Sequence, residues 1–314
     1  MDEGRRPRGG RAVIEIRNLT KKYKDHGALK NLSLSVPEGS AFLIVGANGA
    51  GKTTMIKILM NLVEATSGSA EVLGVDSKRL SPKELAQIGY VSENQELPGR
   101  LSAAEYLAFL RPFYPTWDKH LEQETLRQFR LPVDRKVNEL SHGMRLKLAL
   151  TCALSYRPRL LVLDEPFSGL DPLVRDEFME ELASYSHEMT IFMSSHELGE
   201  TEAFGTDVAF VDDGQLLFQE SMELLTGRMQ EIKVTLDRPA SVPNPVPNHW
   251  IDLKQSGNVL TFVHTQFVEN DLQAQLEAQI GGVQRVAVSP MPLRTIFTSL
   301  SRATRDQRER GASI

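Results

Sequence analysis

The strongest chemical signal in the sequence is a glycine-rich run, Gly46-Ala47-Asn48-Gly49-Ala50-Gly51-Lys52-Thr53-Thr54, directly after the apolar segment Phe42–Val45. It satisfies the phosphate-loop pattern G-x-x-x-x-G-K-[ST] between a predicted strand and a predicted helix. Its glycines let successive backbone N–H groups converge on phosphate oxygens, and the helix N-terminus adds positive potential. We therefore expect Lys52 to reach the β- and γ-phosphates of a nucleotide and the Thr53 hydroxyl to ligate Mg²⁺.

A second signal is a pair of acids, Asp164-Glu165, which follows the apolar run Leu160–Leu163. In open α/β sheets, nucleotides lie outside the carboxyl ends of the strands, which is where these two side chains would be. Asp164 is expected to hold Mg²⁺ through its water shell. Glu165 is expected to polarise the water that attacks the γ-phosphate.

Shorter motifs lie in order around these two: Tyr23 in Lys21-Lys22-Tyr23, then Leu140-Ser141-His142-Gly143-Met144, Ser168-Gly169-Leu170-Asp171 and Ser195-His196. Taken together, the chain from Val13 to about Phe218 resembles the ATP-binding cassette (ABC) ATPases. The Leu-Ser-His-Gly-Met segment is in the place of the family signature Leu-Ser-Gly-Gly-Gln. The segment ending in Asp171 is similar to the family's D-loop, and His196 to its switch histidine.

The resemblance implies a role for each of these residues. Ser141 and Gly143 would bind the γ-phosphate of ATP held on a second copy of the chain, with Asp171 beside the nucleotide. His196 would contact the γ-phosphate within its own copy, as a third catalytic residue beside Lys52 and Glu165. Tyr23 would stack on adenine. Without the resemblance, Ser141 would read as a helix N-cap, His196 as a structural histidine and Tyr23 as a half-buried ring.

The sequence departs from the family in two motifs. His142 replaces the first signature glycine and Met144 the glutamine, although the phosphate-facing Ser141 and Gly143 remain. In Ile88-Gly89-Tyr90-Val91-Ser92-Glu93 the family usually ends on Gln. Glu93 keeps an oxygen that could ligate Mg²⁺ but adds a negative charge, and Gln95 is the alternative if the loop shifts.

Strand-like and helix-like segments alternate along most of the chain, which predicts a parallel sheet with covered faces. We expect a P-loop NTPase cassette of the α/β class, with an antiparallel β subdomain, a helical subdomain and a small C-terminal α+β domain. The expected boundaries are residues 1–11 for a flexible basic N-terminus, 12–228 for the ATPase domain (helical subdomain about 95–157), 229–300 for an accessory domain and 301–314 for a flexible tail. We expect no catalysis from the accessory domain, which would buttress the fold or the dimer.

Composition excludes several classes of protein. Thirty-six Lys and Arg against 41 Asp and Glu give a net charge of −5, so no general attraction to nucleic acid or acidic lipid is expected. The single cysteine, Cys152, excludes an intrachain disulfide and fits a reducing compartment. No run reaches the ~18–20 apolar residues that cross a bilayer, and the N-terminus does not read as a secretory signal.

These features favour the ATP-binding and ATP-hydrolysing subunit of an ABC transporter. We expect a homodimer that sandwiches ATP and powers an integral-membrane permease on a separate chain, at the cytoplasmic face of the membrane. The ending Met291-Pro292-Leu293-Arg294-Thr295-Ile296-Phe297 resembles antibiotic-resistance exporters of the bacitracin and daunorubicin type. The alternatives are a soluble ABC-type ATPase that acts as a switch without transport, or an importer ATPase.

Overall fold

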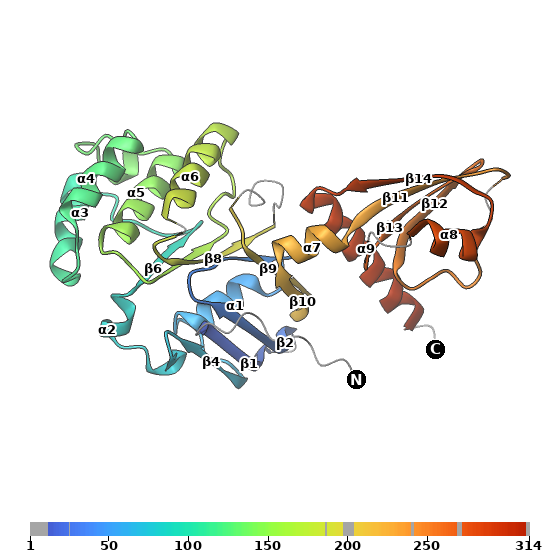
Figure 1. The fold of residues 1–314 in the computed structure, drawn as a ribbon. Coiled ribbons are helices and arrows are strands. Elements are labelled where there is room, and N and C mark those ends of the chain that lie inside the picture. The colour runs from blue at the N-terminus through green and yellow to red at the C-terminus, as the bar shows by residue number, and fades with distance from the viewer. Residues whose placement is uncertain are drawn as a thin grey trace. The chain divides into compact units, whose positions relative to one another are not determined.

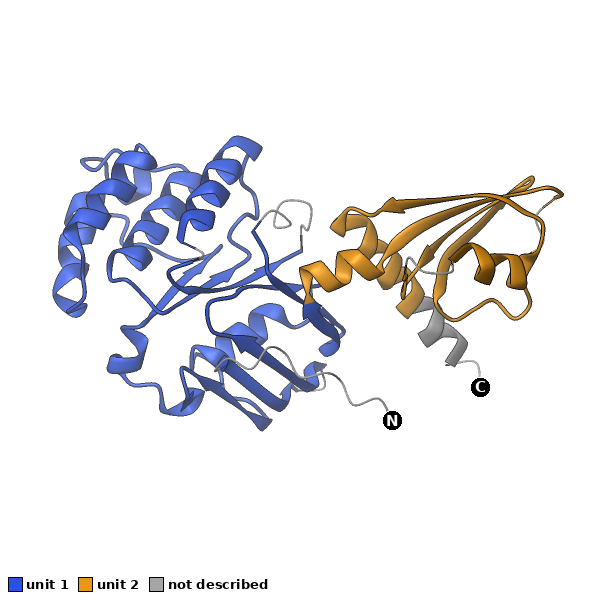
Figure 2. Ribbon diagram, in the orientation of Figure 1, with its two compact units in different colours: residues 1–196, 203–220 blue, residues 197–202, 221–314 orange. Residues whose placement is uncertain are grey.

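The computed structural model of the protein describes residues 12–24, 26–185, 187–196, 204–239, 242–268 and 272–311. The predicted basic segment 1–11 lies outside these residues. The described residues divide into two compact units: those up to residue 196 and from 204 to 220 form the first, and those from residue 221 onward belong to the second (Figure 2). The sequence placed the boundary of the ATPase domain at 228, whereas the structure groups the helix Met222–Arg228 with the second unit.

The centre of the first unit is a mainly parallel sheet with the strand order β10-β9-β3-β8-β7-β6 (Figure 1). Its strands are β3 (Ala41–Val45), β6 (Ile88–Ser92), β7 (Leu160–Asp164), β8 (Thr190–Ser195), β9 (Asp207–Asp212) and β10 (Gln215–Ser221). Every residue of β3, β7 and β8 is buried. The apolar runs read from the sequence as buried parallel strands are thus confirmed, and the carboxyl ends of β3, β7 and β8 meet at one sheet edge.

An antiparallel sheet, β2-β1-β4-β5, covers the helix that follows the phosphate loop. The strands are β1 (Ala12–Tyr23), β2 (His26–Pro37), β4 (Ser67–Val72) and β5 (Val75–Asp76). The helix α1 spans Lys52–Leu59, and its Met55, Ile56 and Leu59 share one apolar core with this sheet and with β3. The helix ends at Leu59, and two residues later Asn61 adopts a left-handed conformation with φ 56°.

Helices and short helical turns fill most of the predicted helical segment 95–157. They are α3 (Ala103–Leu110), η2 (Arg111–Phe113), α4 (Lys119–Gln128), η3 (Val137–Glu139) and α5 (His142–Ser155), preceded in the chain by η1 (Ser77–Arg79) and α2 (Pro82–Leu85) and followed by α6 (Pro172–Tyr185). Ser102 and Glu105 form a capping box at the start of α3. Pro112 is in the 3₁₀ turn η2, which follows this helix directly.

The second unit is a four-stranded antiparallel sheet, β12-β13-β11-β14, with helices packed on it. Its elements are α7 (Met222–Arg228), β11 (Gln230–Leu236), β12 (Trp250–Ser256), β13 (Val259–His264), α8 (Leu272–Ile280), β14 (Val283–Pro290) and α9 (Leu293–Gly311). Strands β12 and β13 are adjacent in the chain and pair as an antiparallel hairpin. Residues 301–311, for which the sequence predicted a flexible tail, continue α9 in the structure, and the arginine, alanine, glutamine and glutamate residues there favour helix.

Among the described residues, no helix combines the length and the apolar character needed to span a membrane.

Cys152 is buried in α5, and burial raises the pKa of its thiol well above the ordinary value. The thiol is therefore protonated and shielded at neutral pH.

Candidate functional site

A cavity of about 520 Å³ lies where the phosphate loop faces the carboxyl ends of the central strands. Eleven of the residues predicted from the sequence line it: Tyr23, Asn48, Gly49, Ala50, Gly51, Lys52, Thr53, Thr54, Glu93, Glu165 and His196. These residues come from five separate segments of the chain. The fold therefore gathers the predicted loop, the predicted base and the predicted histidine around one space.

The phosphate loop is tightly fitted against the rest of the fold. A Cβ atom on Gly46 would lie 2.1 Å from the carbonyl oxygen of Val211, so only glycine fits there. The side chain of Lys52 is 4% exposed, and its Nζ donates to the carbonyl oxygens of Gly46 at 2.5 Å and Ala47 at 3.2 Å. Gly46 and Ala47 thus hold the lysine in place and do not line the cavity.

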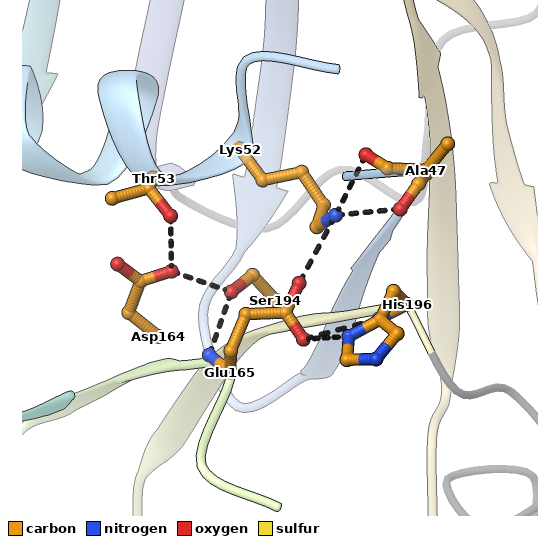
Figure 3. Close-up of polar contacts among 8 residues, drawn as sticks. Ala47, Lys52, Thr53, Asp164, Glu165, Ser194 and His196 are labelled. Atoms are coloured by element: carbon orange, nitrogen blue, oxygen red, sulfur yellow. Dashed lines mark hydrogen bonds and ion pairs between the residues drawn. The ribbon is translucent and has the colours of Figure 1, made fainter. Parts of the chain in front are cut away.

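Behind the loop, Asp164 ends strand β7 and is buried next to α1. Its Oδ1 accepts hydrogen bonds from the Thr53 hydroxyl at 3.1 Å and from the Ser194 hydroxyl at 2.8 Å (Figure 3). Burial raises the pKa of Asp164 above its usual range, while the two hydroxyl groups oppose that shift because they stabilise the carboxylate. Thr53 and Asp164 together place hydroxyl and carboxylate oxygens at the end of the phosphate loop.

Glu165 connects the loop lysine with the histidine. Its Oε1 forms an ion pair with Lys52 Nζ at 3.0 Å. Its Oε2 accepts from the backbone N–H of His196 at 3.2 Å and is 2.6 Å from His196 Nδ1 (Figure 3). Glu165 is therefore in direct contact with both of the other predicted catalytic residues. A carboxylate held this way is suited to orient a water and accept its proton.

Tyr23 is at the end of β1 and is 43% exposed. Lys21 Nζ lies 4.8 Å from the centre of its ring, so one face of the ring is in contact with a cation. The ring lines the cavity with enough open surface to stack against a flat base.

The oxygen donors of the site fit Mg²⁺: Thr53 lines the cavity, and Asp164 is hydrogen-bonded to Thr53 without being one of the lining residues. Across the described residues there is no group of three His, Cys, Asp or Glu side chains that could hold a metal ion on its own. Mg²⁺ in nucleotide sites is usually held by one or two protein oxygens, with phosphates and waters completing its shell, and Thr53 and Asp164 supply such oxygens. Glu93 also lines the cavity, whereas Gln95 is not among the lining residues and its buried Oε1 has no hydrogen-bond partner.

The remaining predicted residues lie apart from the lining of the cavity. Ser141 caps α5, its Oγ accepting from the backbone N–H of Met144 at 3.2 Å. A Cβ on Gly143 would come within 3.0 Å of Val174 Cγ1, and Asp171 Oδ1 accepts from the backbone N–H of Val174 at 3.1 Å. Ser141, Gly143 and Asp171 thus gather near the start of α6, and the cavity of their own chain does not include them.

Three residues at the site were not singled out from the sequence, and a fourth, Ser168, was named only as part of the segment similar to the D-loop. His26, Ala28 and Ser168 line the cavity, and Ser194 bonds to Asp164. His26 and Ala28 belong to a strand with no chemical motif, so only the fold brings them here. The Ser194-Ser195 pair, two polar residues directly after the apolar run Ile191–Met193, is the sequence signal at this position.

Comparisons with known proteins agree with this geometry. Residues 29–168 match the family described as ABC transporter. The chain is 35% identical over 225 residues to the uncharacterized ABC transporter ATP-binding protein YcbN of Bacillus subtilis, covering 70% of this chain and 73% of that protein. It is 33% identical to the bacitracin transport ATP-binding protein BcrA of Enterococcus faecalis, over 69% of this chain and 71% of BcrA.

Among solved structures, a dimeric ATP-binding cassette in a post-hydrolysis state, bound to ADP and Pi, matches with a TM-score of 0.60 and 26% identity. The match covers 67% of this chain and 98% of that one. The predicted α/β cassette fold is thereby confirmed. The sequence relatives, the matched family and the phosphate loop facing a Glu–His pair lead to one conclusion: the chain belongs to the ABC transporter family and is an ATP-binding, ATP-hydrolysing subunit of it.

Proposed function

We propose that hydrolysis takes place in the cavity formed by the phosphate loop, with Lys52, Glu165 and His196 as the catalytic residues. The observation that carries this assignment is the Glu165 carboxylate, held between Lys52 and His196 at the mouth of the loop. Lys52 and the loop N–H groups bind the β- and γ-phosphates. Glu165 orients the attacking water and takes its proton, and His196 fixes the carboxylate and faces the γ-phosphate. Tyr23 stacks on the base.

Mg²⁺ is the second component of the proposed site. Thr53, Asp164 and Glu93 would hold it, directly or through water. When bound, the ion neutralises charge on the β- and γ-phosphates. Asp164 is fixed for this task by two hydroxyl groups, and Glu93 contributes a carboxylate where the related proteins usually have an amide.

Glu93→Gln tests the metal role of this residue. Because like charges ~4–5 Å apart repel by about 1–4 kcal/mol at effective dielectric constants of 80–20, a carboxylate beside the triphosphate should favour metal-bound over metal-free ATP. We expect the variant to bind Mg-ATP nearly as the wild type does and to discriminate less against ATP in EDTA. Calorimetric titration with Mg²⁺ and with EDTA measures both affinities.

The matched control is Glu96→Gln, which removes a charge from an exposed side chain of the same loop. Its metal preference should equal that of the wild type. An unchanged preference in Glu93→Gln would exclude Glu93 as a ligand and leave a role in coupling to a membrane partner.

We further propose a head-to-tail homodimer in which Ser141, Gly143 and Asp171 of one copy complete the cavity of the other. The placement of Ser141 at the N-terminus of the 14-residue helix α5 supports this, since such an end attracts a phosphate. So does the position of all three residues away from the cavity of their own chain. The dimeric relative with ADP and Pi shows that a cassette of this fold can dimerise.

The proposed partner is an integral-membrane permease on a separate chain, which places the protein at the cytoplasmic face of the membrane. The likeness to a bacitracin transport subunit supports an exporter over an importer or a soluble switch. Affinity purification of the tagged protein from detergent-solubilised membranes tests this proposal. Recovery of a multispanning membrane protein with the chain would support a transporter, and recovery of the chain alone from an ATPase-active preparation would favour the soluble switch.

A further inference from the structure

Ser194, in strand β8 of the central sheet, is hydrogen-bonded to both acids of the site, Asp164 and Glu165. It is 0% exposed and lies near the end of β8. In the parallel register it is paired with Ile44 of β3 on one side and with Asp164 of β7 on the other. Strand pairing on both sides fixes its backbone, so its side chain has a defined direction.

The hydroxyl group of Ser194 makes two hydrogen bonds, one to each acid. Its Oγ donates to Asp164 Oδ1 at 2.8 Å, and the same oxygen accepts from the backbone N–H of Glu165 at 2.9 Å (Figure 3). Both distances are ordinary for strong hydrogen bonds. Because the hydroxyl has one proton to donate, these two bonds fix its orientation.

The bond to Glu165 has a geometric consequence. Glu165 has a φ of 51°, in the left-handed region that side chains other than glycine rarely adopt. Such a conformation persists only where surrounding contacts hold it. The N–H of Glu165 is anchored by Ser194, while its carboxylate is fixed by Lys52 at 3.0 Å and His196 at 2.6 Å.

The bond to Asp164 has a second consequence. Thr53 of the phosphate-loop helix donates to the same oxygen, Oδ1, at 3.1 Å. The two hydroxyl groups, one from α1 and one from β8, therefore set the orientation of the carboxylate.

We propose that Ser194 is a positioning residue. Its single hydroxyl group fixes the Asp164 carboxylate and the Glu165 backbone in position relative to each other. Ser194 does not line the cavity and touches no reacting atom; it acts through the two acids. The inference rests on the proposed roles of these acids in Mg²⁺ binding and hydrolysis.

The test compares Ser194→Ala with Ser194→Thr. Losses of about 10- to 100-fold in metal affinity or activity are typical when a partner that orients a metal ligand is removed. We expect Ser194→Ala to lower kcat about 10- to 100-fold with little change in KM for ATP. We also expect a weaker gain in ATP affinity on addition of Mg²⁺, measured by titration without turnover. Ser194→Thr keeps the hydroxyl group and should restore both properties.

Thr190→Ala is the matched control. Thr190 is a buried residue of the same strand, and its hydroxyl also accepts a backbone N–H bond, from Gly39 at 2.9 Å. Its loss should lower the melting temperature about as much as Ser194→Ala does but leave kcat and the Mg²⁺ gain unchanged. If the extra methyl group of Ser194→Thr lowers the melting temperature, the comparison of Ser194→Ala with Thr190→Ala is sufficient to test the positioning role.

The outcomes separate this inference from the function on which it rests. If Ser194→Ala keeps the wild-type kcat and Mg²⁺ gain while the wild type hydrolyses ATP, the positioning role is wrong and the proposed site stands. If Thr190→Ala loses activity equally, the effect is one of general stability, which also overturns the inference. If the wild type shows no Mg²⁺-dependent ATP binding, the proposed function itself fails.

Discussion

Lys52→Ala is expected to abolish most ATP binding. Removing one partner of a buried, hydrogen-bonded charge contact costs about 2–5 kcal/mol, which corresponds to about 30- to 5000-fold in Kd. Lys52 meets these conditions, because its side chain is buried and its Nζ lies beside the loop carbonyls and Glu165. Isothermal titration of ATP into the purified variant measures the loss.

The control for this experiment is Lys119→Ala. Lys119 is also the first residue of a helix, α4, but its side chain is exposed and far in sequence from the phosphate loop. Its removal should leave the Kd unchanged. An affinity of Lys52→Ala equal to that of the wild type, in a variant with a normal melting temperature, would refute the assignment of the loop as the nucleotide site.

Glu165→Gln should separate ATP binding from hydrolysis. The amide keeps the shape of the side chain but cannot accept the proton of the attacking water, and loss of a general base typically costs about 10²- to 10⁴-fold in rate. We expect the variant to bind ATP, to accumulate as a dimer and to release almost no phosphate. Phosphate release and size-exclusion chromatography with Mg-ATP measure these two properties.

Glu180→Gln provides the matched comparison, because Glu180 is exposed on α6. It should hydrolyse ATP at the wild-type rate. A wild-type rate of hydrolysis by Glu165→Gln would exclude Glu165 as the base. A Glu165→Gln variant that stays monomeric with ATP bound would argue against the ATP sandwich.

The sequence predicted the parts of the site that are continuous in the chain. The loop that includes Lys52 and the acids at the end of β7 each follow directly on a short run of buried apolar strand residues. Such local patterns determine both the structure and the chemistry of a short segment, so they can be interpreted without coordinates.

The parts that escaped prediction depend on contacts between distant segments. Ser194 contacts the site only because β8 pairs with β7 in a register that places it opposite Asp164. His26 lines the cavity because β2 folds next to the phosphate loop, although nothing in its own segment indicates a ligand. The length of α9 was not predicted, because its last residues are polar and charged, a composition that is also typical of a solvated tail.

The buried position of Cys152 has a practical consequence for measuring the proposed dimer. Because this thiol is the only one in the chain and is both covered and protonated, maleimide dyes at neutral pH should leave it unlabelled. A single cysteine introduced at an exposed position such as Leu62, which is 61% accessible, would then carry the dye alone. Mixing donor-labelled and acceptor-labelled copies would turn association of the subunits into an energy-transfer signal, in a chain whose native sequence needs no cysteine removed.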